Sequence, residues 1–193
     1  MKKLFCSVVL AGAVGFMGLN SLVAGAYDID VPHSSVDFQV KHMMLSNVKG
    51  NFDKFSGVAE IDSKSKTLTK LEGTIEISSI NTRNESRDKH MLSNEYFDAE
   101  KFPKGTLKMK KFSKEKNGIK VVADLTLKNV TKEVVFTGEL NGPGKNEMSK
   151  KEIFALNLNG KINRKNFNIG NDTSSATMGE DVEIQIALEL SAK

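Results

Sequence analysis

Apolar and polar residues alternate along much of this chain, and this pattern limits the fold more than any other feature of the sequence. The last segment is the clearest case, because five apolar side chains occupy every second position: Val182, Ile184, Ile186, Leu188 and Leu190. A period of two places successive side chains on opposite faces of a β-strand. We therefore predict a strand over 182–190, with Ile186 facing inward and Gln185 facing solvent.

Seven further segments show apolar inward positions bounded by turn residues. Asn117-Gly118 joins two of them, and this dipeptide is the strongest short hairpin signal. Another pair is joined by a loop that opens with Asn141-Gly142-Pro143-Gly144. The predicted strands before the last one are 36–41, 52–61, 71–80, 106–112, 119–127, 134–140 and 153–162.

Eight strands with one apolar face each predict an all-β fold, and we favour an extended eight-stranded antiparallel barrel, whose closure leaves no exposed sheet edge. A two-sheet sandwich would show the same local alternation. One segment differs: Thr82 and Glu85 fit a capping box, with Thr82 as N-cap, and helical spacing follows as far as Pro103. We predict a helical insert over 82–100, between the third and fourth strands, which caps an end of the barrel or gates its mouth.

The N-terminal segment has the features of a secretory signal peptide. Lys2 and Lys3 precede an apolar stretch over 4–19, and Ala24-Gly25-Ala26 provides small residues for cleavage. We predict a cleaved signal peptide over 1–26, export to the periplasm, and a single domain over 27–193. The one cysteine, Cys6, lies in this leader, so the predicted mature domain holds no disulfide. No later apolar run reaches the length of a membrane-spanning helix.

Motifs for catalysis are absent from the sequence: it has no nucleophile elbow, phosphate loop, dinucleotide fingerprint or paired-histidine zinc motif. His33, His42 and His90 show no ligand spacing. We therefore predict no catalytic residue, no cofactor and no metal. The basic run Lys108–Lys111 is best explained as the solvated face of a strand, because no stacking aromatic residues accompany it, and we predict no binding of nucleic acid.

The inward positions of the strands predict either a packed core or a cavity for an apolar ligand, and periodicity does not separate the two. Methionines after the first strand and on the insert suit a flexible ligand. The predicted ligand-contacting residues are Phe38, Val40, Met43, Met44, Phe52, Ile75, Ile77, Met91, Phe97, Met109, Val121, Phe136, Phe154, Leu156, Leu158, Phe167, Ile184 and Ile186.

Several motifs together resemble the YceI-like, polyisoprenoid-binding family, in order along all of 27–193. They are Tyr27-Asp28-Ile29-Asp30, His33-Ser34, Phe38-x-Val40-x-His42, Val48-x-Gly50-x-Phe52, Phe55-x-Gly57, Ser78–Thr82, Arg87-Asp88, Tyr96-Phe97-Asp98, Phe102-Pro103, Leu125-Thr126-Leu127, Asn129–Lys132 and Gly179–Val182. Near the seventh strand the family usually has Arg-x-acid-Phe-Gly. Here Arg164 and Phe167 match, whereas Asn166 replaces the acid and Asn168 replaces the glycine; asparagine still tolerates a positive φ. The charge balance around Arg164, and with it the head-group preference, therefore does not follow from the resemblance.

The resemblance implies a lipocalin-like barrel in the periplasm that holds a long-chain isoprenoid or similar fatty lipid, with homodimers known in the family. The expected function is non-catalytic binding, transport or sequestration of that lipid. Polar residues expected at the mouth, near the ligand head, are His33, His42, Arg87, Asp88, His90 and Arg164. Two alternatives remain open: a periplasmic enzyme or metal- or haem-binding protein using His33, His42 and His90, with Arg87 and Asp88, and a structural stress protein with a filled core.

Overall fold

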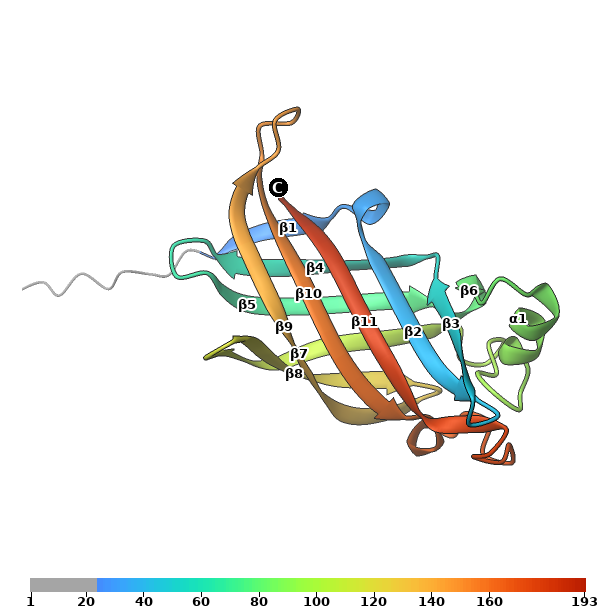
Figure 1. Cartoon of the computed structure of the whole chain (residues 1–193). Helices are drawn as coiled ribbons and strands as arrows, with labels where there is room; N and C mark the ends of the chain where they lie inside the picture. The colour runs from blue at the N-terminus through green and yellow to red at the C-terminus, as the bar shows by residue number, and fades with distance from the viewer. Residues whose placement is uncertain (1–23) are drawn as a thin grey trace, which may run out of the picture.

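The computed structural model describes residues 24–193 and consists mainly of antiparallel strands (Figure 1). It contains one α-helix, α1 (Glu85–Leu92), and three short 3-10 turns, η1 (Val31–His33), η2 (Ile77–Ser79) and η3 (Arg164–Phe167). The strands are β1 (Gly25–Ile29), β2 (Ser35–His42), β3 (Ser46–Phe52), β4 (Phe55–Asp62), β5 (Thr67–Glu76), β6 (Ile80–Asn81), β7 (Lys104–Glu115), β8 (Gly118–Leu127), β9 (Val130–Lys145), β10 (Glu152–Asn163) and β11 (Met178–Ala192).

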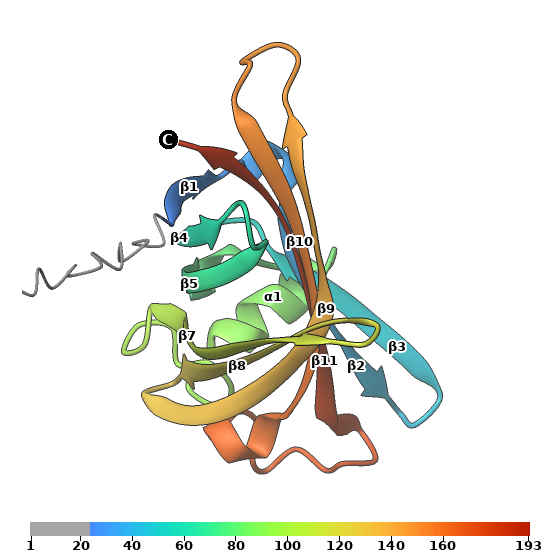
Figure 2. The ribbon, with the colours of Figure 1, turned by 90° about the vertical axis from the view of Figure 1, so that its left-hand side faces the viewer.

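Eight strands close into a ring. Each pairs antiparallel with the next in the order β1-β4-β5-β7-β8-β9-β10-β11, and β11 returns to β1 through the pairs Tyr27–Ala192 and Ile29–Leu190. Figure 2 shows this arrangement, with α1 seen through the ring of strands. The predicted eight-stranded barrel is therefore confirmed, and the closure of the ring excludes two separate sheets.

The remaining strands, β2, β3 and β6, extend the sheet from β11 away from the ring. The 15-residue β11 pairs with β1 near its C-terminal end and with β2 over Met178–Ala187. β1 and β3 are absent from the strands predicted by the alternation. β1 begins inside the predicted leader, and β3 is mostly polar, with Gly50 in its interior. The ring is thus completed by β1, whereas the predicted first strand, β2, lies in the extension.

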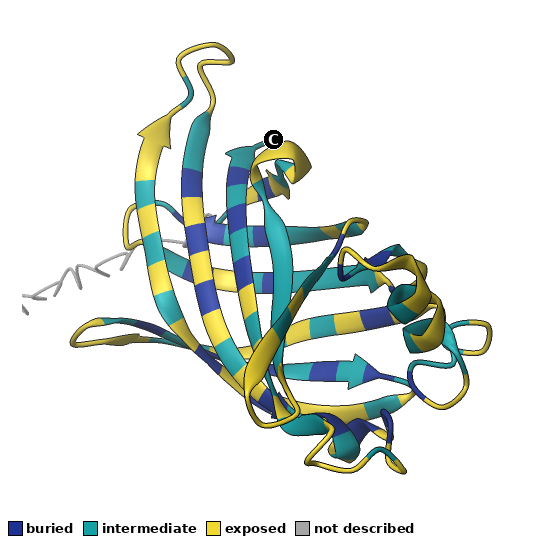
Figure 3. Cartoon of the chain, turned by 45° about the vertical axis from the view of Figure 1, so that its right-hand side comes forward, coloured by how far each residue is buried: buried dark blue, intermediate teal, exposed yellow. Residues whose placement is uncertain are grey.

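Burial follows the predicted alternation on the ring strands. In β10, Phe154, Leu156 and Leu158 are buried, and the residues between them are exposed; Figure 3 shows such alternating bands along the strands. In β11, Ile186 is buried and Gln185 is exposed, as predicted. One interior position requires glycine, because a β-carbon at Gly160 would lie 2.6 Å from the ring of the fully buried Phe136.

The insert between β6 and β7 is helical, but its helix is shorter than predicted. Asn84, rather than Thr82, is the N-cap, and its side chain accepts a hydrogen bond from the backbone N–H of Arg87 at 3.0 Å. The Thr82 side chain is engaged instead with Arg87 and Asp88. After Leu92 the chain forms turns, closed by hydrogen bonds such as Asp98 N–H to the Ser93 carbonyl at 2.8 Å. No helix in 24–193 has the length and apolar character needed to cross a membrane.

Residues 1–23 of the predicted signal peptide lie outside the described residues. Its last residues are described, since β1 begins before the predicted cleavage site and pairs Gly25 with Ile61 and Ala26 with Glu60 of β4.

The two faces of β10 give a direct test of the inward assignment. Leu158→Asp should reduce the free energy of unfolding by about 3–5 kcal/mol, because it places a carboxylate without a partner in the apolar interior. Asn159→Asp, on the neighbouring exposed position of the same strand, should change it by less than about 0.5 kcal/mol. Urea unfolding followed by circular dichroism measures both. Equal midpoints would show that the face is wrongly assigned.

Candidate ligand-binding cavity

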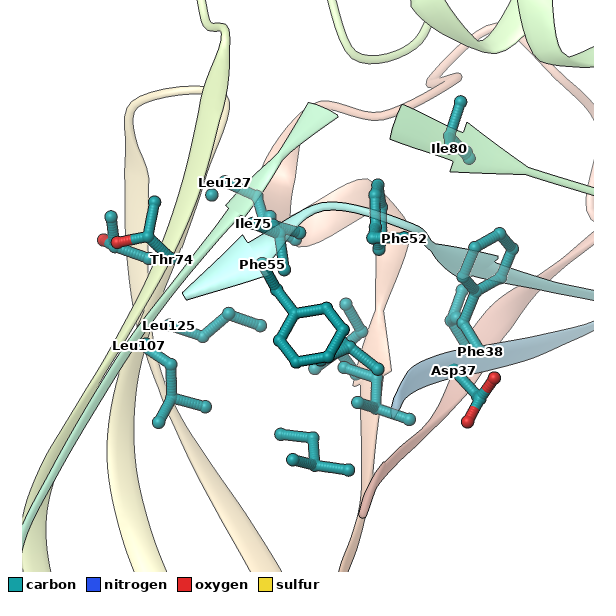
Figure 4. Close-up of a pocket in the computed structure, with 18 of the residues that line it drawn as sticks. Asp37, Phe38, Phe52, Phe55, Thr74, Ile75, Ile80, Leu107, Leu125 and Leu127 are labelled. Atoms are coloured by element: carbon teal, nitrogen blue, oxygen red, sulfur yellow. The ribbon is translucent and has the colours of Figure 1, made fainter. Parts of the chain in front are cut away.

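The interior of the barrel contains a cavity with an almost entirely apolar wall. The volume of this cavity is about 170 Å³. Figure 4 shows side chains from both sides of this space, with Phe38 and Phe52 on one side and Leu107 and Leu125 on the other. Such a wall, with few polar atoms to compensate, binds by excluding water from apolar surface.

Half of the predicted ligand-contacting residues line this cavity. They come from the extension, the ring strands and the insert, so the cavity spans all three parts of the fold. These residues are Phe38, Val40, Phe52, Ile75, Met91, Phe97, Phe136, Ile184 and Ile186.

The other predicted contact residues lie elsewhere, because much of the barrel interior is packed core rather than cavity. Met43 and Met44 are exposed on the turn between β2 and β3, and Met109 is partly buried against the core. Tyr27 is buried in the packed core, where its ring meets that of Phe154 edge-on with the ring centres 5.5 Å apart. The predicted contact residues that are buried without lining the cavity are Ile77, Val121, Phe154, Leu156, Leu158 and Phe167.

Some wall residues were missed by the sequence analysis. Most of them lie at inward positions of strands, so the alternation indicates that they face inward, but it does not distinguish cavity wall from packed core.

Three aromatic rings connect the extension to the insert: the ring centres of Phe38 and Phe52 are 5.6 Å apart, and Phe52 meets Phe97 edge-on at 6.1 Å. The main additional apolar wall residues are Ile29, Val36, Phe55, Leu71, Ile80, Leu107, Leu125, Leu127, Ile162, Ile169, Met178, Val182 and Leu188.

Arg164 is a buried cation in the wall of this cavity. Its guanidinium group donates to five backbone carbonyls in the connection from β10 to β11: the Nε–H to Gly179, the Nη1 group to Ile169 and Gly170, and the Nη2 group to Thr173 and Met178. A guanidinium has five N–H donors, so this network leaves none for a ligand. Burial lowers the pKa of Arg164 from its ordinary value. Arg164 therefore shapes the wall, and it can act on a ligand only through its charge.

The residues around Arg164 show how the two asparagines fit. Asn168 ends η3 with φ 57° and ψ 35°, the left-handed conformation expected where the family has glycine. Asn166 is exposed, whereas Arg164 is buried.

Arg87 and Asp88 fix the start of the insert. The hydroxyl of the buried Thr82 donates to Asp88 Oδ1 at 2.5 Å and accepts from Arg87 Nε at 2.7 Å, and the Thr82 carbonyl accepts from Arg87 Nη2 at 2.7 Å. Thr82 directly follows β6, which pairs with β3. Arg87 and Asp88 therefore tie α1 to the extension, and within 24–193 no hydrogen bond or ion pair joins either residue to Arg164.

The three histidines lie apart, and all are exposed. His33 is 3.1 Å from Asp30 and belongs to a group with Glu189 whose ligand atoms lie within 4.8 Å of one another; the bond to Asp30 raises the pKa of His33. His90 is 2.9 Å from Glu95. His42 ends β2. Within 24–193 the histidines thus form no common ligand cluster, and the arrangement does not favour the enzyme or metal alternative built on all three.

Comparison with known proteins agrees with this architecture. The family model for the YceI-like domain matches residues 27–190. The UPF0312 protein of Staphylococcus aureus strain USA300 is 40% identical over 169 residues, which cover 86% of this chain and 96% of that protein. The corresponding protein of strain N315 is 39% identical with the same coverage.

Solved structures show the same fold. A crystal structure of the Campylobacter jejuni YceI protein is 39% identical, with a TM-score of 0.74 over 79% of this chain and 90% of that one. A polyisoprenoid-binding domain from Saccharophagus degradans is 16% identical, with a TM-score of 0.65 over 88% of this chain and 99% of that one, and it shows likeness of fold alone. The family model and the relatives near 40% identity show that this chain belongs to the YceI-like domain family.

Proposed function

We propose that this protein binds a long-chain isoprenoid or similar apolar lipid without catalysing a reaction, and carries or sequesters it in the periplasm after removal of the predicted signal peptide. The apolar cavity is the observation that carries the proposal, because its wall offers contact with hydrocarbon and few polar atoms. The polyisoprenoid-binding domain of Saccharophagus degradans, which has the same fold, supports it by analogy.

Desolvation of the ligand tail supplies the binding energy in this proposal. Each buried methylene contributes about 0.8 kcal/mol, so a tail of about twenty carbons contributes on the order of 15 kcal/mol before the costs of association. One neutral hydrogen bond to a head group contributes only about 1 kcal/mol. Tail length should therefore dominate affinity, and polar residues at the mouth should orient the head.

The structure narrows the residues that can act on the head. Arg164 has no free donor, so we assign it an electrostatic effect only. Arg87 and Asp88 hold the insert that contributes Met91 and Phe97 to the cavity wall. We propose that they act by positioning this insert over the ligand.

The first prediction concerns the contents of the cavity. An organic extract of the purified protein should contain an apolar lipid by mass spectrometry. Val182→Phe, which adds bulk to the wall, should weaken isoprenoid binding by about tenfold or more, because it displaces about two methylenes. Val135→Phe, the same change at an exposed position of β9, is the control and should bind normally.

Two results would contradict this. An extract without lipid, together with no binding of isoprenoids in titration, would support the filled-core alternative. Equal loss of binding in the two variants, with unchanged thermal stability, would show that Val182 does not face the ligand.

The second prediction concerns the insert. Arg87→Ala should weaken binding of a head-bearing isoprenoid by about 1–3 kcal/mol, the cost of a lost charge-assisted hydrogen bond. A hydrocarbon of equal length should lose a similar amount of affinity, since Met91 and Phe97 of the insert form part of the apolar wall. Lys89→Ala, at an exposed position of the same helix, serves as the control. Calorimetric titration of both ligands decides the matter: unchanged affinity for both in Arg87→Ala would contradict the positioning role.

A further inference from the structure

The turn between β2 and β3 exposes three consecutive large apolar side chains. Met43 is 53% exposed, Met44 65% and Leu45 86%. The other exposed large apolar residues in 24–193 are single: Val31, Val135 and Met148. A continuous apolar run on the surface marks an interaction site more often than scattered residues do.

Backbone geometry makes these side chains more unusual. Met43 has φ 50° and Met44 has φ 57°, the left-handed region that disfavours residues with a β-carbon. Glycine or asparagine would suit both positions better. Turn chemistry therefore does not account for the two methionines, and neither does packing, because their side chains extend into solvent.

The charges beside the tip are positive. Lys41, His42 and Lys49 are exposed, and residues 41–50 include no acid. Among the described residues no carboxylate lies within 4.0 Å of either lysine. The acids on the neighbouring start of β11 have their own partners, since Glu180 pairs with Lys165 at 3.2 Å and Asp181 with Lys161 at 3.6 Å. An apolar tip with free cationic flanks matches the surface of an anionic bilayer, which holds hydrocarbon beneath negative head groups.

The tip adjoins the cavity wall. The Met43 N–H donates to the Thr177 carbonyl at 3.0 Å, and His42 pairs with Met178 across β2 and β11. Met178 and Val40, two residues before His42, both line the cavity. Figure 1 shows this hairpin at the end of the molecule near the β10–β11 connection, away from the projecting β9–β10 hairpin.

A protein that exchanges lipid with a membrane needs a surface that contacts the bilayer, and such a tip provides one. Exposing a long hydrocarbon tail to water is strongly unfavourable, so a carrier gains by taking the lipid directly from a membrane. We propose that Met43, Met44 and Leu45 insert into the surface of an anionic bilayer, with Lys41 and Lys49 on the lipid head groups, and seat the barrel for lipid exchange. This inference rests on the proposed lipid-binding function.

Flotation with vesicles tests the inference. The wild type should float with phosphatidylcholine vesicles that contain phosphatidylglycerol, and bind less at high salt. A variant with Met43→Asn, Met44→Asn and Leu45→Ser should bind at least about tenfold more weakly, since it removes most of the inserted apolar surface. Asparagine tolerates the left-handed conformation, so this variant should fold. Met148→Ser, at a residue 95% exposed on the other hairpin, is the control and should float like the wild type.

Three results would overturn the inference: a wild type that does not float, a tip variant that floats as well as the wild type, or light scattering that shows a wild-type dimer and a monomeric tip variant, which would make the tip a self-association surface. Titration of an isoprenoid in solution separates membrane docking from lipid binding. In that titration the tip variant should keep the affinity of the wild type. Absence of binding by the wild type would refute the lipid-binding proposal, whereas flotation reports on docking itself.

Discussion

The pairing of β11 on both of its edges is the constraint on which the rest of the structure depends. One edge pairs with β10 from Ile153 to Asn163, and the other is shared between β1 and β2. The shared edge closes the ring at one end and lets the extension diverge at the other. It also brings Val182, Ile184 and Ile186 to the cavity wall. A shorter β11 would lack either the closure or the extension.

The interior is divided between packed core and cavity, and that division sets what the protein can do. Phe154 and Leu156 are fully buried in the packed part of the barrel and do not line the cavity. Along the extension, the ring of Phe52 meets that of Phe97 in the insert edge-on, and Phe38 lies beside Phe52. Arg164 holds the connection that borders this region through backbone carbonyls alone, so it leaves the cavity apolar except for its charge.

Much of this fold was predictable from the sequence, because a strand with one buried face shows a regular alternation of apolar and polar residues. β1 and β3 were not, since one overlaps the predicted leader and the other is polar. The cavity was only partly predictable: inward positions look alike whether neighbours fill the space, as around Leu158, or leave it open, as around Ile184. The exposure of Met43 and Met44 depends on a turn geometry that composition does not reveal. The left-handed Asn168, in contrast, follows from residue type.

In the proposed function, burial of an apolar tail in this cavity drives binding. Calorimetric titration of a homologous series of linear alcohols that differ only in chain length tests it most directly. Affinity should rise by about fourfold for each added methylene, which corresponds to about 0.8 kcal/mol, until the cavity is full. Affinity that is independent of chain length would contradict the account.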